Sequence, residues 1–145
     1  MHVNLRNCGE GHTTRPGLRV GADVVDVQAI EMSLQTFGAR FERRIFTPHE
    51  VDVARGSAQR LAARLAAKEA VIKALDLAEV GVDWRHIEVS SDSAGRPSLR
   101  LHGRAAQRAH ELGVQALALS LSHEGRVALA AVVAQLAPPE APDSG

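Results

Sequence analysis

One uninterrupted stretch, residues 57–75, does most to limit the folds open to this chain. It is rich in alanine and leucine and contains neither glycine nor proline, two features that favour a helix. Its larger apolar residues recur at helical spacing and form one stripe, made by Leu61, Leu65, Ile72 and Leu75. The stretch therefore predicts a long helix from Ser57 to Leu75 that packs one face against the rest of the domain.

Shorter elements precede this helix. β-Branched residues favour a strand at 18–27, and a helix is expected at about 29–37. Thr47, Pro48 and Glu50 supply an N-cap, a proline in the first helical turn and a capping glutamate, so a second helix should begin there.

After the long helix the pattern changes to alternating apolar residues. A hairpin is predicted at 87–101, with its turn at Gly95, and a second hairpin at 116–134. Residues 104–112 are typical of a helix that Gly113 ends. The sum is an α+β fold with a largely antiparallel sheet packed against the long helix.

The length of 145 residues suits one compact domain. Residues 1–16 and 138–145 are polar or proline-bearing without periodicity, so both ends are expected to be loose tails around a domain at 17–137. Aromatic residues make up only 3% of the chain, so each buried side chain removes little surface from water. We therefore expect neighbouring subunits to complete the core.

The charge balance bears on partners. The 17 basic and 17 acidic residues cancel, which argues against a dedicated nucleic-acid binder. Residues 40–68 are locally basic, however, with seven Arg or Lys against three Asp or Glu. That region would suit an acidic macromolecule or a phosphate compound.

Cysteine content and hydropathy bear on location. The single Cys8 allows neither an intrachain disulfide nor a cysteine-based metal site, so a reducing cytoplasm is the expected compartment. The longest apolar run, Val127 to Ala134, is too short to cross a bilayer, so no membrane association is expected.

Asp23 interrupts the apolar run of the first predicted strand. A charge there is disfavoured unless it is paired or binds a metal. Alternation along a strand equally allows a position that faces solvent. Both interpretations stay open on the residues alone.

Three charged residues of the long helix can be interpreted as structural or as functional. Lys68 lies within the apolar stripe, either with its ammonium reaching water or at a phosphate site. Glu69 and Lys73 are four residues apart and share a face, either as a weak surface ion pair or as a place where a metal ion and phosphate oxygens meet.

Other common sites are excluded. Ser122 and His123 are adjacent on a predicted strand and point to opposite faces, and there is no GxSxG elbow, so a serine hydrolase is rejected. No HExxH, CxxC, GxGxxG or GxxxxGK[ST] pattern occurs, which removes the usual zinc and nucleotide-loop sites.

Several short motifs occur together in a recognisable order. They are VGADVVD at 20–26, FERRIFTPHE at 41–50, RLAAKEA at 64–70 with Lys73, IEV at 87–89, GRP at 95–97 and SLSH at 120–123. In this order the chain resembles the holo-[acyl-carrier-protein] synthase family over residues 18–133. The resemblance implies the 4′-phosphopantetheinyl transferase fold.

The resemblance also implies an activity. The enzyme would transfer the 4′-phosphopantetheine moiety of coenzyme A to a serine of an apo acyl carrier protein, release 3′,5′-ADP and require Mg²⁺. It implies a homotrimer with sites at subunit interfaces. The alternative is a non-catalytic module that retains the fold and binds coenzyme A or a carrier protein. Whether the carrier serves fatty-acid, polyketide or peptide synthesis is left open.

Site residues follow from the matching motif positions. Asp23 and Glu69 would hold the Mg²⁺ ion, while Glu69 and Lys73 would be catalytic. The resemblance implies a larger set at the coenzyme A site: Arg64, Lys68, Lys73, Pro97 and His123. Arg40 and Arg44 would contact the acyl carrier protein.

Three positions differ from the family pattern. Arg19 replaces the first glycine of a G-x-G-x-D stretch, Ala29 replaces an arginine that contacts the carrier, and Asp76 stands in a turn where the family has glycine. A carboxylate at Asp76 would repel the pyrophosphate unless it faces away.

Overall fold

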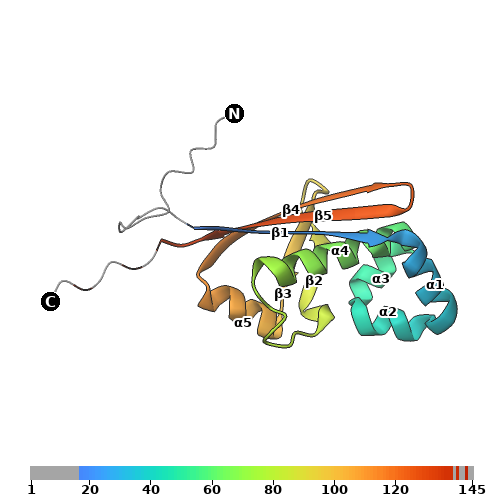
Figure 1. The fold of residues 1–145 in the computed structure, drawn as a ribbon, viewed down its shortest axis with the longest axis horizontal. Coiled ribbons are helices and arrows are strands. Elements are labelled where there is room, and N and C mark those ends of the chain that lie inside the picture. The colour runs from blue at the N-terminus through green and yellow to red at the C-terminus, as the bar shows by residue number, and fades with distance from the viewer. Residues whose placement is uncertain (1–16, 139, 141–142, 144–145) are drawn as a thin grey trace.

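The computed structural model describes residues 17–138, 140 and 143. The tails expected at 1–16 and 138–145 therefore lie almost wholly outside the described residues. The elements follow one another as β1 (Leu18–Asp26), α1 (Val27–Phe37), α2 (Ala39–Ile45), α3 (Pro48–Ala54), α4 (Ala58–Ala74), a 3₁₀ turn η1 (Trp84–His86), β2 (Ile87–Ser91), β3 (Pro97–Leu101), α5 (Gly103–Glu111), β4 (Val114–Glu124) and β5 (Val127–Leu136) (Figure 1).

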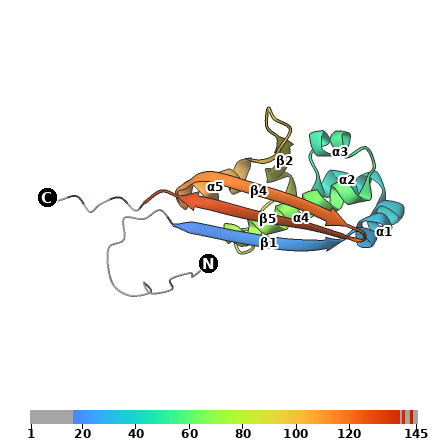
Figure 2. The ribbon, with the colours of Figure 1, turned by 90° about the horizontal axis from the view of Figure 1, so that it is seen from above.

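The strands form two antiparallel sheets. One has three strands in the order β1-β5-β4, and the other is the β2-β3 hairpin. Figure 1 shows the larger sheet edge-on with the helices on one side of it, and in Figure 2 the same three strands run side by side. The predicted α+β class and both predicted hairpins are confirmed.

Helix α4 matches its prediction closely. Ser57 caps its first turn by accepting a hydrogen bond from the backbone N–H of Arg60, and the helix ends at Ala74 with Leu75 as its C-cap. Six of its nine buried residues are alanines, which lets α4 lie close to the sheet because alanine has only one methyl group to accommodate. Small residues on α4 thus bring its polar side chains near β1.

Gly21 makes the closest approach between β1 and α4. A Cβ atom at Gly21 would lie 1.9 Å from the backbone oxygen of Ala70. No non-glycine side chain fits there without moving the helix, so this glycine sets the spacing between the two elements.

The helix starts are also informative. The predicted capping box is present, since Thr47 Oγ1 accepts from the N–H of Glu50 and Glu50 Oε1 accepts from the N–H of Thr47. Asp26 caps α1 by accepting from the N–H of Gln28. Helix α2 was not predicted, because its seven residues are too few to show a helical period.

The face of the larger sheet that turns away from the helices is apolar and exposed. Leu18, Val20 and Val24 of β1 are 72%, 70% and 58% exposed, and Leu129 and Val133 of β5 are 41% and 40% exposed. An apolar patch of this kind is typical of a surface that meets another protein.

No helix in the described part of the chain is both long and apolar enough to span a bilayer.

Candidate functional site

Two carboxylates from distant parts of the chain meet where β1 runs along α4. Asp23 lies on the face of β1 that turns toward the helix, and Glu69 projects from α4. Their side chains lie close enough for each to change the proton affinity of the other. The spacing that Gly21 permits makes this meeting possible, because it brings the helix within reach of a short aspartate side chain.

Lys73 joins the same group from one turn further along α4. Its Nζ lies 2.7 Å from Asp23 Oδ1 and 3.1 Å from the backbone oxygen of Ala22. The side chain of Asp23 is 15% exposed and that of Lys73 is 57% exposed. The ammonium is therefore held in place yet open to a ligand from solvent.

The two carboxylates have different proton affinities. Burial, the hydrogen bond with Asp23 and the charge of Asp23 together raise the pKa of Glu69 to about 7, and Lys73 opposes the rise. Burial acts to raise the pKa of Asp23 as well, but the hydrogen bonds to Glu69 and Lys73 and the charge of Lys73 outweigh it and hold the pKa below its ordinary value. Glu69 is thus the carboxylate that can exchange a proton near neutral pH.

The donor set suits a hard divalent cation that keeps other ligands. No group of three or more His, Cys, Asp or Glu able to hold a metal is found among the described residues. Asp23 and Glu69 offer two carboxylates at one place. Mg²⁺ is commonly bound by one or two carboxylates together with water and substrate phosphates, so these residues fit it.

Lys68 is not at this site. Its side chain is fully buried, and Nζ donates to Glu50 Oε1 at 2.7 Å, to the backbone oxygen of Trp84 at 3.1 Å and to that of Ile87. The interpretation that its ammonium reaches water is wrong. The expected contact with coenzyme A does not fit either, because all three N–H donors are already used inside the protein.

Burial of this pair has an electrostatic consequence. Desolvation lowers the pKa of Lys68, and the charge of Glu50 and its hydrogen bond oppose that change. Glu50 Oε2 also accepts from the N–H of Val89, so the pair links α3, α4 and β2. Its role here is to hold these elements together.

Arg64, Pro97 and His123 lie away from the carboxylates. Arg64 is about 140° around α4 from Glu69, on the face that Lys68 shares. Pro97 is exposed at the start of β3, and His123 is exposed on β4, opposite Ala128 of β5. Within residues 17–138 no hydrogen bond or ion pair joins these three to Asp23, Glu69 or Lys73.

Arg64 has an unusual environment. Its side chain is partly buried. Burial and the charge of Arg60 lower the pKa of Arg64, whereas the charge of Glu50 raises it. Nη1 donates to the backbone oxygen of Arg60 at 3.1 Å, and the buried Nε has no hydrogen-bond partner among the described residues. Nη2 makes no hydrogen bond among the described residues, so the end of the guanidinium retains donors for an anion from outside this chain.

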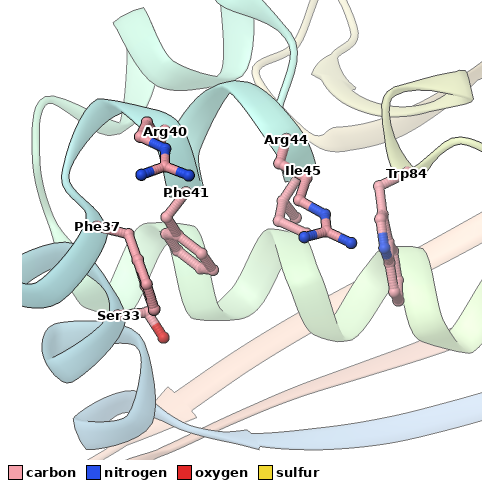
Figure 3. Close-up of a pocket in the computed structure, with 7 residues that line it drawn as sticks. All are labelled: Ser33, Phe37, Arg40, Phe41, Arg44, Ile45 and Trp84. Carbon is pink, nitrogen blue, oxygen red and sulfur yellow. The ribbon is translucent and has the colours of Figure 1, made fainter.

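Arg40 and Arg44 line a separate groove of about 430 Å³ (Figure 3). Its apolar lining comes from Phe37, Phe41 and Ile45, and Trp84 lies on the far side of Arg44. The sequence motifs had indicated the two arginines as binding residues, but they did not predict the apolar residues or the tryptophan of this groove. Only the packing of the unpredicted α2 against η1 brings them together.

One further pair was missed. Arg19 of β1 and Asp76, two residues beyond α4, form a salt bridge. The sequence marked both positions as unusual, but nothing in it indicated that they meet.

Comparisons with known proteins agree with the motif pattern. The family model described as the 4′-phosphopantetheinyl transferase superfamily matches residues 19–132. A holo-[acyl-carrier-protein] synthase of Herpetosiphon aurantiacus is 46% identical over 123 residues, which cover 80% of this chain and 97% of the relative. A protein of the same name from Koribacter versatilis is 43% identical over 120 residues, covering 80% of this chain and 96% of the relative. The Chronobacterium ammoniagenes ACPS-CoA complex has a TM-score of 0.71 at 36% identity and covers 83% of this chain and 98% of that one.

Proposed function

This chain belongs to the 4′-phosphopantetheinyl transferase superfamily and is an enzyme of the holo-[acyl-carrier-protein] synthase type, and we propose that it transfers the phosphopantetheine arm of coenzyme A to a serine of an acyl carrier protein. 3′,5′-ADP is the expected second product. The observation that carries the proposal is the meeting of Asp23, Glu69 and Lys73 between β1 and α4. Residues 17–137 form the transferase domain.

The chain's own residues supply charge and proton transfer. The Lys73 ammonium, fixed on Asp23 and the backbone oxygen of Ala22, neutralises oxygens of the pyrophosphate and of the departing 3′,5′-ADP. Glu69, beside Lys73 on the same face of α4, accepts the proton of the attacking serine hydroxyl. The bond that forms joins the serine oxygen to the β-phosphorus, and the bond that breaks joins that phosphorus to the bridging oxygen of 3′,5′-ADP.

Mg²⁺ is the cation proposed for Asp23 and Glu69, where it would draw charge from the phosphate oxygens. The two carboxylates leave room in its coordination shell for water and phosphate, which is the arrangement that Mg²⁺ prefers.

The remaining coenzyme A residues act across a subunit interface in a homotrimer. Two observations support this: the exposed apolar face of β1 and β5, and the position of Arg64 on the opposite side of α4 from Glu69. The Nη2 donors of Arg64 then meet a phosphate at the neighbouring copy's site, close to Pro97 and His123.

The groove beside α2 receives the carrier protein. Arg40 and Arg44 offer positive charge at its edge, and Phe41 and Ile45 offer apolar surface in its lining. An acidic partner with an apolar helix face fits both features.

A mass-spectrometric assay tests the proposal. The protein is incubated with coenzyme A, Mg²⁺ and a panel of apo carrier proteins, and each carrier is examined for a covalent phosphopantetheine arm. A Glu69→Gln variant serves as the matched control. Transfer by the natural protein and its loss in the variant are expected, and no transfer to any carrier that a reference synthase modifies would overturn the proposal.

The alternative is a binding module without catalysis. It predicts that calorimetry detects tight coenzyme A binding while no carrier in the panel is modified. The same samples therefore separate the two functions.

A further inference from the structure

Arg19 connects β1 to the end of α4 by two contacts. Its Nε donates to the backbone oxygen of Ala74 at 2.6 Å, and its Nη2 donates to the Asp76 carboxylate. The Arg19 side chain is 28% exposed and that of Asp76 is 63% exposed. The pair thus lies at the surface, where solvent and ligands can reach the carboxylate.

Asp76 occupies a position that disfavours it in two ways. It follows the C-cap Leu75 and has a φ of 51°, the left-handed region in which glycine is preferred. The N–H of Leu77 donates to the oxygen of Ile72, which completes the turn that ends α4. A carboxylate here also lies at the negative end of the helix dipole. The negative charge of Asp76 at this end of the helix therefore needs a nearby cation to balance it, and Arg19 provides that cation.

Like the carboxylate site, the pair bridges β1 and α4. Arg19, Gly21 and Asp23 alternate onto one face of β1, so Arg19 is about 13 Å along the strand from Asp23. Asp76 follows Lys73 by three residues, less than one helical turn. The Debye length grows from about 10 Å in 0.1 M salt to about 30 Å in 0.01 M salt, so at low salt these separations let the Asp76 charge act on an anion bound at Lys73.

We infer that Arg19 screens the Asp76 carboxylate from an anionic substrate, so that the two residues together set the affinity for coenzyme A. The inference rests on the proposed function, in which the pyrophosphate binds beside Lys73. Without Arg19, the unpaired carboxylate repels the phosphates. Removing the carboxylate as well abolishes that repulsion.

The test compares Arg19→Ala, Asp76→Asn and the double variant, with the KM for coenzyme A and its Kd by calorimetry as readouts. Arg19→Ala should raise both constants about fivefold in low salt, the size expected for one like charge acting at this distance on a multiply charged ligand. Adding Asp76→Asn should return both constants to within about twofold of the natural protein. The kcat should stay the same in the single and the double variant.

The salt dependence of coenzyme A affinity is a second readout. It would not change if Arg19 had only a structural role. The defect of Arg19→Ala should shrink as salt rises from 0.05 M to 0.5 M, because screening weakens the repulsion.

Arg108→Ala is the matched control. Arg108 of α5 donates through Nε to the backbone oxygen of Leu75 at 3.2 Å, so this variant also removes an arginine that contacts the end of α4 but leaves Asp76 paired. Its coenzyme A affinity should stay unchanged.

Either of two results overturns the inference: an unaltered affinity in Arg19→Ala, or a double variant as weak as the single one. If the natural protein binds coenzyme A but transfers nothing, the proposed function fails. The Kd for coenzyme A in the variants still tests the role of Arg19 in that case.

Discussion

Lys73 Nζ lies 2.7 Å from Asp23 Oδ1, although 50 residues separate them in the sequence. The ion pair joins the strand to the helix at the place where Glu69 also projects. It fixes the ammonium before any substrate arrives, and a group held in advance stabilises developing charge without the cost of reorienting. The carboxylate thereby orients the lysine, and under the proposed function it also offers oxygens to the cation.

Replacing Lys73 should mainly affect turnover. Lys73→Met is expected to lower kcat about 100-fold, because it removes the positive charge that balances the phosphate in the transition state. Its side chain is 57% exposed and its ion pair with Asp23 is screened by water, so the free energy of unfolding should change by less than about 1 kcal/mol. Single-turnover transfer rates and urea unfolding measure the two effects. A variant that keeps its kcat would remove Lys73 from the mechanism.

Substituting Gly21 should separate β1 from α4. In Gly21→Ala the added Cβ would lie 1.9 Å from the oxygen of Ala70, so the helix must shift, at a cost of about 2 kcal/mol. Gly17→Ala is the matched control, since its Cβ meets only Leu136 at an ordinary 3.5 Å. Denaturant unfolding and the transfer assay should both show a loss for Gly21→Ala alone. Equal stability of the two variants would contradict this packing argument.

The stability of the metal-free protein should depend on pH through Glu69. Its pKa in the folded protein, about 7, is above the ordinary 4.5, so folding favours the protonated form. The contribution of Glu69 to stability is therefore complete below pH 4.5 and is lost as pH rises toward 7 and beyond. Thermal unfolding between pH 5 and pH 8 measures this trend.

The matched variant is Glu69→Gln. Its stability should not show the decrease with rising pH that the ionisation of Glu69 causes. Adding Mg²⁺ at pH 8 should raise the unfolding temperature of the natural protein more than that of the variant, because a cation stabilises the ionised carboxylate. Identical pH profiles for the two proteins would show that Glu69 does not titrate in this range.

The buried Lys68–Glu50 pair should be costly to break. Lys68→Met leaves Glu50 buried without its cation, and such a loss costs about 3 kcal/mol or more. Urea unfolding measures it, with Lys73→Met as a control because that lysine lies on the same helix but is exposed. Equal losses in both variants would show that burial of the pair contributes nothing.

The exposed sheet face should mediate self-association. Val20→Asp places a charge in the apolar patch of β1 and should shift the protein toward monomers in sedimentation experiments. Val53→Asp on α3, where the valine is 39% exposed, is the control and should leave association unchanged. If Val20→Asp assembles as the natural protein does, the interface lies elsewhere.

Elements with local signals could be predicted from the amino-acid sequence. Residues 57–75 became α4 with Ser57 as the cap, the Thr47 and Glu50 capping box formed, and both hairpins appeared, because periodicity and caps depend on neighbours within a few residues. The family also followed from the order of the short motifs. The seven-residue α2 escaped because it is shorter than the window in which a period can be recognised.

Which charged residues pair with one another depends on the packing of elements that are distant in the sequence. Lys68 and Lys73 are both lysines on one helix, yet one is buried on Glu50 and the other is open beside Asp23. Arg19 and Asp76 each differ from the family pattern, and their pairing appears only when β1 lies along α4. Charges act through distance in space, and the packing of small residues such as Gly21 against Ala70 sets those distances, which no local pattern along the chain encodes.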